Sequence, residues 1–112
     1  MKINVSIITD LDAPSRKNPK AAEWQHWIAG NIPGNEMDLA DILTTYEIPT
    51  PPKGTGLHRY VFLVYKQPQE FVFDEPSVLG RANFNHLEFA IKYNLEGPIA
   101  AQFFVSQWDY TV

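Results

Sequence analysis

Cysteine is absent from the 112-residue chain, which excludes disulfide bonds and metal sites with cysteine ligands. Such a composition fits a reducing compartment, so we expect a cytoplasmic protein. Basic residues are also few: 9 Lys and Arg stand against 13 Asp and Glu, which gives a net charge of −4. This balance does not favour nucleic-acid binding. No apolar run is long enough to cross a bilayer, so we expect peripheral membrane contact at most.

The composition is that of an ordinary globular protein, with 45% apolar and 20% charged residues. A chain of this length holds at most one small domain, and we therefore treat residues 1–112 as a single domain. A domain of this size buries a limited core and has a thin stability margin.

The hydrophobic pattern predicts a mostly β protein with four or five strands and one helix. Alternation of apolar and polar residues, or β-branched and aromatic enrichment, predicts strands at residues 3–9, 23–31, 57–66 and 99–108. Residues 39–48 are ambiguous between helix and strand, and the prolines that follow them favour a short strand. Residues 57–66 are apolar on both faces, which predicts a central, buried strand.

Residues 85–95 form the only convincing helical segment. Asn85 is a suitable N-cap, and Glu88 stands three residues later, as in a capping box. Leu87, Ala90 and Ile91 form an apolar stripe, so we expect this face of the helix to pack on the sheet.

Two histidines lie on apolar strand faces. Side chains alternate along a strand, so Trp24, His26 and Ile28 are expected on one face of their strand, and His58 and Tyr60 on one face of theirs. A histidine in such a position is more often a hydrogen-bonded core residue than a ligand-binding group. The residues alone therefore leave both interpretations open. The third histidine, His86, opens the helix, and we expect it at the surface.

Carboxylates stand close to the two histidines in this scheme. Asp10 and Asp12 follow the first strand, and with His26 and His58 they suggest a small concave site. Two imidazoles and a carboxylate also resemble a metal-binding triad with open positions. A metal-dependent hydrolase built on His26, His58 and Asp10 or Asp12 is the alternative function.

Two sequence blocks resemble those of a known family. The blocks TDLDAPSRKNPKAAEWQHWIAGNIPGN and PPKGTGLHRYVFLVYKQ contain the signatures D-x-D-A-P-S-R and G-x-H-R, with a W-x-H strand between them. Together they resemble the phosphatidylethanolamine-binding protein family, in its animal branch, over nearly all of residues 3–110. The resemblance implies an antiparallel β-sheet fold with a smaller second sheet and one or two short helices.

The resemblance also implies a site and a function. Family members hold an anionic group, such as a phospholipid headgroup or a free anion, in a small pocket without a cofactor, and they bind protein kinases as inhibitors or scaffolds. We therefore expect non-enzymatic binding of a phosphatidylethanolamine-like phospholipid or a phosphate-type anion, with a kinase as a further partner. The expected ligand-binding residues are Asp10, Pro14, Trp24, His26, Pro52, His58 and Tyr60.

Simple chemistry makes such a pocket reasonable. Each imidazole can donate a hydrogen bond to a phosphate, and a bound anion favours the protonated ring. Asp10 can orient a ring by accepting from its other nitrogen. The sharp turn between Asp12 and Ser15 beside the pocket suggests a cis Ala13–Pro14 bond.

The chain departs from the family pattern in several ways. Leu11 replaces the usual proline between the two aspartates, and Gln25 stands where many members have another histidine. The family domain also continues beyond both ends, with N-terminal strands and a C-terminal helix that carries a pocket tyrosine. We therefore expect a partial domain that is marginally stable and self-associates through an open sheet edge.

Overall fold

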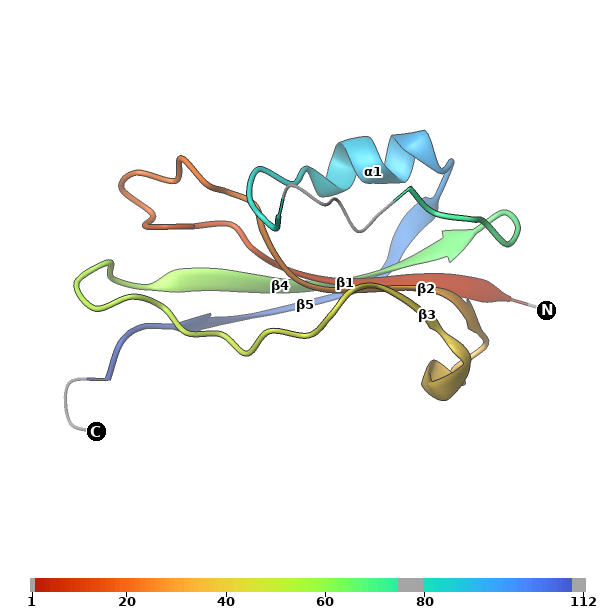
Figure 1. The fold of residues 1–112 in the computed structure, drawn as a ribbon, viewed down its shortest axis with the longest axis horizontal. Coiled ribbons are helices and arrows are strands. Elements are labelled where there is room, and N and C mark those ends of the chain that lie inside the picture. Colours follow the sequence, from red (N-terminus) through yellow and green to blue (C-terminus); the bar gives the residue numbers. More distant parts are fainter. Residues whose placement is uncertain (1, 75–79, 110–112) are drawn as a thin grey trace.

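The computed structural model describes residues 2–74 and 80–109, and these residues build a five-stranded antiparallel sheet (Figure 1). The strands are β1 (Ile3–Asp10), β2 (Trp24–Pro33), β3 (Asp41–Thr44), β4 (His58–Gln67) and β5 (Glu96–Ser106). Their order across the sheet is β3-β2-β1-β4-β5. The predicted mostly β class is confirmed, and β4 is an interior strand as its sequence predicted.

Two short helices complete the described secondary structure: the 3-10 helix η1 (Met37–Leu39) and the α-helix α1 (His86–Lys92). The ambiguous segment 39–48 is divided between structures. It begins at the end of η1, forms β3 over four residues, and continues as an irregular chain beyond Thr44. The strand interpretation is therefore confirmed for its middle part alone.

The hydrophobic core lies between one face of the sheet and α1, which runs across that face (Figure 1). Val5 and Ile7 of β1 are fully buried, and they pair with Tyr65 and Leu63 of β4. Apolar side chains from the two central strands thus form a continuous floor beneath the helix. Burial of this kind is the main favourable contribution to folding.

Helix α1 begins as predicted but buries a different face. The Asn85 side chain accepts hydrogen bonds from the backbone N–H groups of Leu87 and Glu88, which satisfies two free donors of the first turn. Leu87 is 60% exposed and Ile91 is 79% exposed, so these two residues of the predicted stripe face solvent, and only Ala90 of the stripe packs against the core. Phe89 and Tyr93 are buried in their place. These two residues lie one turn apart, and their rings pack on each other at 5.1 Å.

The opposite face of the sheet carries a second set of aromatic contacts. Ile28 pairs with Ile7 and belongs to the core on the helix side, whereas Trp27 stacks on Phe62 on the other face. A β-bulge in the β1–β2 ladder shifts the register between these regions. The prediction that Ile28 shares a face with His26 is therefore wrong, because strict alternation does not hold through a bulge.

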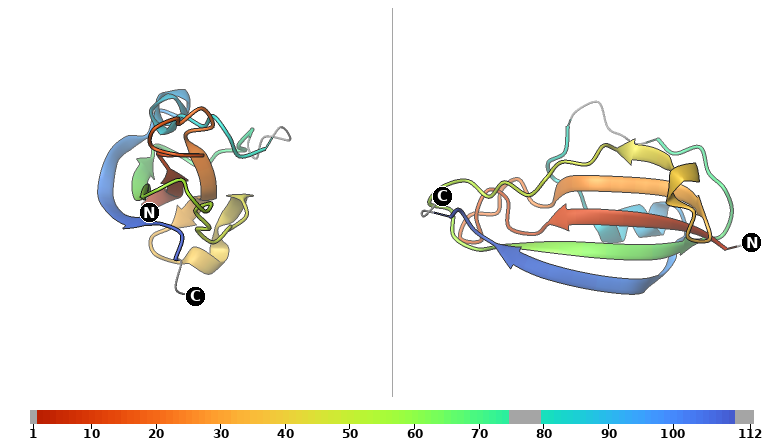
Figure 2. Two further views of the ribbon diagram at one scale, coloured as in Figure 1. Left: turned by 90° about the vertical axis from the view of Figure 1, so that its left-hand side faces the viewer. Right: turned by 90° about the horizontal axis from the view of Figure 1, so that it is seen from below.

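Three segments lie at the same end of the molecule: the β1–β2 loop, the irregular segment 48–57 and the residues after β5 (Figure 2). The N-terminus and η1 lie at the other end. Within the described residues, no helix is long and apolar enough to cross a membrane.

Candidate functional site

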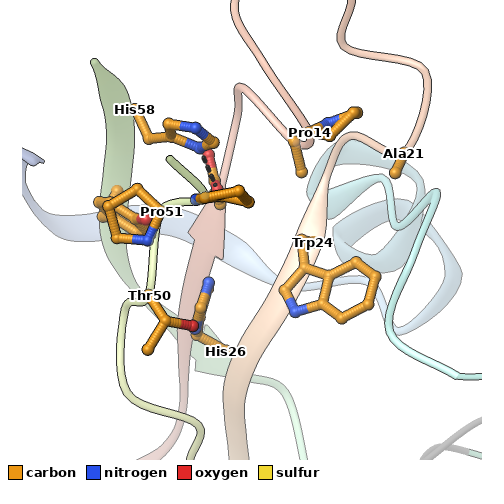
Figure 3. Close-up of a pocket in the computed structure, with 11 residues that line it drawn as sticks. Pro14, Ala21, Trp24, His26, Thr50, Pro51 and His58 are labelled. Atoms are coloured by element: carbon orange, nitrogen blue, oxygen red, sulfur yellow. Dashed lines mark hydrogen bonds and ion pairs between the residues drawn. The ribbon is translucent and has the colours of Figure 1, made fainter. Parts of the chain in front are cut away.

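A cavity of about 200 Å³ lies between the ends of β1, β2 and β4, the β1–β2 loop and segment 48–57 (Figure 3). Its lining residues are Asp10, Ala13, Pro14, Ala21, Trp24, His26, Thr50, Pro51, Pro52, His58 and Tyr60. All seven residues expected to bind a ligand are among them. The other four lie in the β1–β2 loop and in segment 48–57, and an alanine, threonine or proline in a loop gives no chemical signal of its own.

Strand register explains why these distant residues meet. Asp10, the last residue of β1, pairs with Trp24 on one side and with Tyr60 on the other. The chain then leaves β1 through the Ala13–Pro14 bond, which is cis as predicted. The beginnings of β2 and β4 are thus held on both sides of the carboxylate at the end of the central strand.

His58 is buried and has a protein partner at each ring nitrogen. Its Nδ1 lies 2.8 Å from Asp10 Oδ2, so the carboxylate accepts from this nitrogen and fixes the ring. Its Nε2 lies 2.8 Å from Thr55 Oγ1, whose hydroxyl also lies 2.7 Å from the carbonyl oxygen of Pro52. Thr55 thus lies against the ring nitrogen of His58 that Asp10 leaves open.

His26 differs from His58 in this respect. Its Nδ1 lies 2.8 Å from the backbone carbonyl oxygen of Glu47. A carbonyl can only accept, so Nδ1 carries the hydrogen and the neutral ring has a bare Nε2. Within the described residues Nε2 has no hydrogen-bond partner, and the ring borders the cavity beside Thr50 (Figure 3). His26 therefore provides the ring nitrogen that is available to a ligand.

Glu47 fixes the neighbouring wall as well. Its Oε1 accepts from the indole Nε1 of Trp24 at 3.0 Å, and its Oε2 lies 3.3 Å from Arg81 Nε. Its backbone N–H also donates to the carbonyl oxygen of His26 at 2.8 Å. One residue thus orients the indole and the imidazole that face the cavity, although no motif in the sequence pointed to it.

Tyr60 forms the aromatic floor of the site. Its ring lies edge-on to His26 at 5.3 Å, and it stacks on His58 at 6.1 Å and on Phe104 at 5.1 Å. Burial, and then the nearby carboxylates of Asp10 and Asp12, raise the pKa of the Tyr60 phenol. The phenol is therefore protonated at neutral pH, and the floor carries no charge of its own.

Asp12 has a structural partner rather than a place in the cavity. Its carboxylate accepts from the backbone N–H, the Nε and the Nη2 of Arg59 at 2.8–2.9 Å. The hydrogen bond from the Arg59 side chain is the main cause that holds the pKa of Asp12 below its ordinary value, against the effect of burial. The pair ties the β1–β2 loop to the start of β4.

The geometry does not support the metal-dependent alternative. Within residues 2–74 and 80–109, no group of three or more His, Asp and Glu side chains could hold a metal ion. Asp10 is bonded to His58, and Asp12 is bonded to Arg59. The remaining histidine, His86, is half-buried rather than at the surface as expected, and its Nδ1 lies 2.7 Å from Glu23 Oε2.

Comparison with known proteins places the chain in a family. The family model described as phosphatidylethanolamine-binding protein matches residues 4–104. The chain belongs to the phosphatidylethanolamine-binding protein family. A Drosophila melanogaster protein with the provisional name odorant-binding protein A5 is 38% identical over 103 residues, which are 88% of this chain and 49% of that protein. The chain thus spans about half the length of this curated relative.

Two solved structures are similar to this chain in fold. A carboxypeptidase Y inhibitor, solved in complex with its cognate proteinase, is 28% identical with a TM-score of 0.85 over 96% of this chain and 61% of that one. A phosphatidylethanolamine-binding protein from Plasmodium vivax is 19% identical, with a TM-score of 0.70 over 95% of this chain and 64% of that one. The second likeness shows the fold alone.

Proposed function

We propose that this chain is a non-enzymatic binding module that holds a phosphorylated headgroup or a similar anion in the cavity at His26. The observation that carries the proposal is the contrast between the two rings. His58 is fully occupied by Asp10 and Thr55, whereas Nε2 of His26 borders the cavity without a protein partner among the described residues. Family membership and the name of the fly relative support the binding of a small ligand.

The proposed contact requires a proton. Nδ1 of His26 already carries a hydrogen for Glu47, so Nε2 can donate to an anion only when the ring is an imidazolium. When the His26 ring is neutral in the free protein, binding of the anion is therefore coupled to uptake of one proton by the ring. By linkage, affinity for the anion is greatest in mildly acid solution and falls as pH rises. Asp10 at the cavity wall would meet the ammonium of an ethanolamine group.

Calorimetric titration with phosphorylethanolamine tests the proposal. His26→Ala should weaken binding by about 1.5–3 kcal/mol, the usual contribution of a hydrogen bond to a charged group. His86→Ala is the matched control, because it removes an imidazole outside the cavity and should leave the affinity unchanged. Equal binding by the parent and His26→Ala, or an affinity that rises with pH, would refute this assignment.

Two finer roles remain proposals. A phospholipid as the source of the headgroup would bind with its chains leaving the cavity, and a short-chain phosphatidylethanolamine should then bind more tightly than phosphorylethanolamine. The kinase-regulatory role implied by the resemblance is tested by adding the purified protein to a kinase assay with and without the His26→Ala substitution.

A further inference from the structure

Strand β5 forms one edge of the sheet and, among the described residues, has no neighbouring strand on its outer side (Figure 2). Every residue of β5 before Ser106 is exposed. Edge strands are commonly protected by charged side chains, by proline or by short length. Here Pro98 stands near the beginning of the strand, and residues 97–106 contain no charged side chain. The edge from Ile99 onward therefore lacks the usual protection against pairing with another strand.

The hydrogen bonds of β4 show which backbone groups of β5 point outward. Both backbone groups of Arg59 bond to residues just after β1, at 3.0 Å and 2.8 Å, so Arg59 faces β1. This direction alternates along a strand, so Tyr60 and its partner Phe104 face each other between β4 and β5. The N–H and C=O of Phe103 consequently point outward. In agreement, the Phe103 N–H donates to Oε1 of the adjoining Gln102 side chain at 3.1 Å.

The order of side chains along this edge suits pairing with a second copy of itself. Gln102 is the central residue of the stretch from Ile99 to Val105. A twofold axis at Gln102 sets the two strands antiparallel and places Phe103 of each copy opposite Ala101 of the other. A large side chain thus meets a small one. A register centred on Phe103 would instead place this phenylalanine opposite itself.

The same register matches both faces of the strand. Phe103 pairs with Val61, which packs against the core, so the Phe103 side chain lies on the face that carries α1. On this face a groove of about 470 Å³ is lined by Leu11, Arg59, Val61, Ala101, Gln102 and Phe103. Phe103 of the second copy, placed over Ala101, would enter this groove. On the other face Phe104 would lie opposite the small side chain of Ala100.

We propose that β5 is the interaction surface for a second copy of this chain, bound by antiparallel strand pairing about a twofold axis at Gln102. The outward backbone groups of Phe103 exchange two hydrogen bonds with those of Ala101 in the other copy. Each copy has a net charge of −4, but residues 97–106 carry no charge, so like charges do not meet at the strand. The interface is closed because each edge occupies the other. The proposal does not depend on a ligand at His26.

Cysteine crosslinking tests the register. The parent has no cysteine, so a single substitution introduces the only thiol. Gln102 faces its own copy as a non-hydrogen-bonded pair, with Cα atoms about 4.5 Å apart, a distance that a disulfide can span. We expect Gln102→Cys to form a disulfide dimer under mild oxidation, and Ala101→Cys and Phe103→Cys to form far less because each is displaced by two residues from its own copy. Val72→Cys, at a 97% exposed position outside the sheet, is the control and should stay monomeric.

A charge swap at the axis tests the interface without a covalent bond. Gln102→Lys and Gln102→Glu each place like charges directly opposite one another, which destabilises strand pairing. We expect sedimentation velocity to show a dimer dissociation constant about fivefold higher for each variant alone, and within about twofold of the parent for the equimolar mixture. Val72→Lys and Val72→Glu, alone or mixed, are the matched controls and should dimerise like the parent. Circular dichroism checks that each variant is folded.

Several results would overturn the proposal. One is a parent protein that remains a monomer in sedimentation velocity at every concentration, and another is open-ended growth beyond a dimer. Preferential crosslinking of Ala101→Cys or Phe103→Cys would assign a different register. Equal crosslinking of Val72→Cys would show that the disulfides form by random collision. A mixture of the two Gln102 charge variants that associates as weakly as either variant alone would show that Gln102 does not meet its own copy.

Discussion

Asp12→Asn is the substitution that tests most sharply how the loop beside the cavity is held. The Asp12 side chain is 1% exposed and accepts three hydrogen bonds from Arg59, whose side chain is 39% exposed. An asparagine of nearly the same shape keeps one acceptor oxygen but turns an amide N–H₂ toward a guanidinium that can only donate. Hydrogen bonds to charged groups contribute about 1.5–3 kcal/mol. Because Arg59 can turn to water, we expect a loss of about 2 kcal/mol at pH 7.

The same substitution should change the response to acid. The pKa of Asp12 is lower in the folded protein than the ordinary carboxylate value, which is near 3.9. The ionised Asp12 carboxylate therefore stabilises the fold fully above that ordinary value. This stabilisation is lost as pH falls through the lower pKa of the folded state. The stability difference between parent and variant should therefore be largest near neutral pH and shrink in acid.

Thermal unfolding followed by circular dichroism measures this difference. At pH 7 a loss of about 2 kcal/mol corresponds to a Tm lower by roughly 10 °C in a domain of this size. Asp38→Asn, which neutralises an exposed carboxylate on η1, is the control and should stay within about 0.5 kcal/mol. A variant as stable as the parent at pH 7, or a gap that stays constant into acid, would show that the Asp12–Arg59 pair does not stabilise the fold.

Three further predictions concern the helix and the sheet edge. Phe89→Ala should cost about 3–5 kcal/mol in urea unfolding, while Leu87→Ala should cost about 0.5 kcal/mol or less; the reverse order would place the wrong face of α1 on the sheet. Asn85→Ala should cost about 1 kcal/mol through loss of the N-cap, and Asn85→Asp should restore most of it if capping is the cause. The protein should self-associate in sedimentation velocity through the exposed edge strand β5, where Phe103 is 64% exposed, and Phe103→Lys should reduce this; a monodisperse parent monomer would contradict the prediction.

Local signals in the sequence predicted much of the fold because they act over a few residues. Alternation located the strands, and Asn85 marked the start of α1. The helix face was predicted wrongly, because the stripe of Leu87 and Ile91 is as apolar as the pair Phe89 and Tyr93, and only the position of the sheet decides between them. The bulge in β2 was missed for a related reason, since the register depends on the pairing strand.

The cavity required the family resemblance as well as the residues. The residues suggested that two imidazoles and an aromatic wall lie near Asp10, and the resemblance added the prolines. The different states of the two imidazoles could not be predicted, because they depend on Thr55 and on the backbone of Glu47. Those partners are fixed by the folded loops rather than by a sequence motif. Ligand binding by the site and the cytoplasmic location stay predictions.

A crystal structure of the protein with phosphorylethanolamine at mildly acid pH tests the central proposal most directly. We expect a phosphate oxygen about 2.7–2.9 Å from His26 Nε2, the usual length of a charge-assisted hydrogen bond. We also expect His58 to remain bonded to Asp10 and Thr55. An empty cavity at saturating ligand, or a phosphate held by His58 after Thr55 has moved away while His26 makes no contact, would contradict the proposed binding mode.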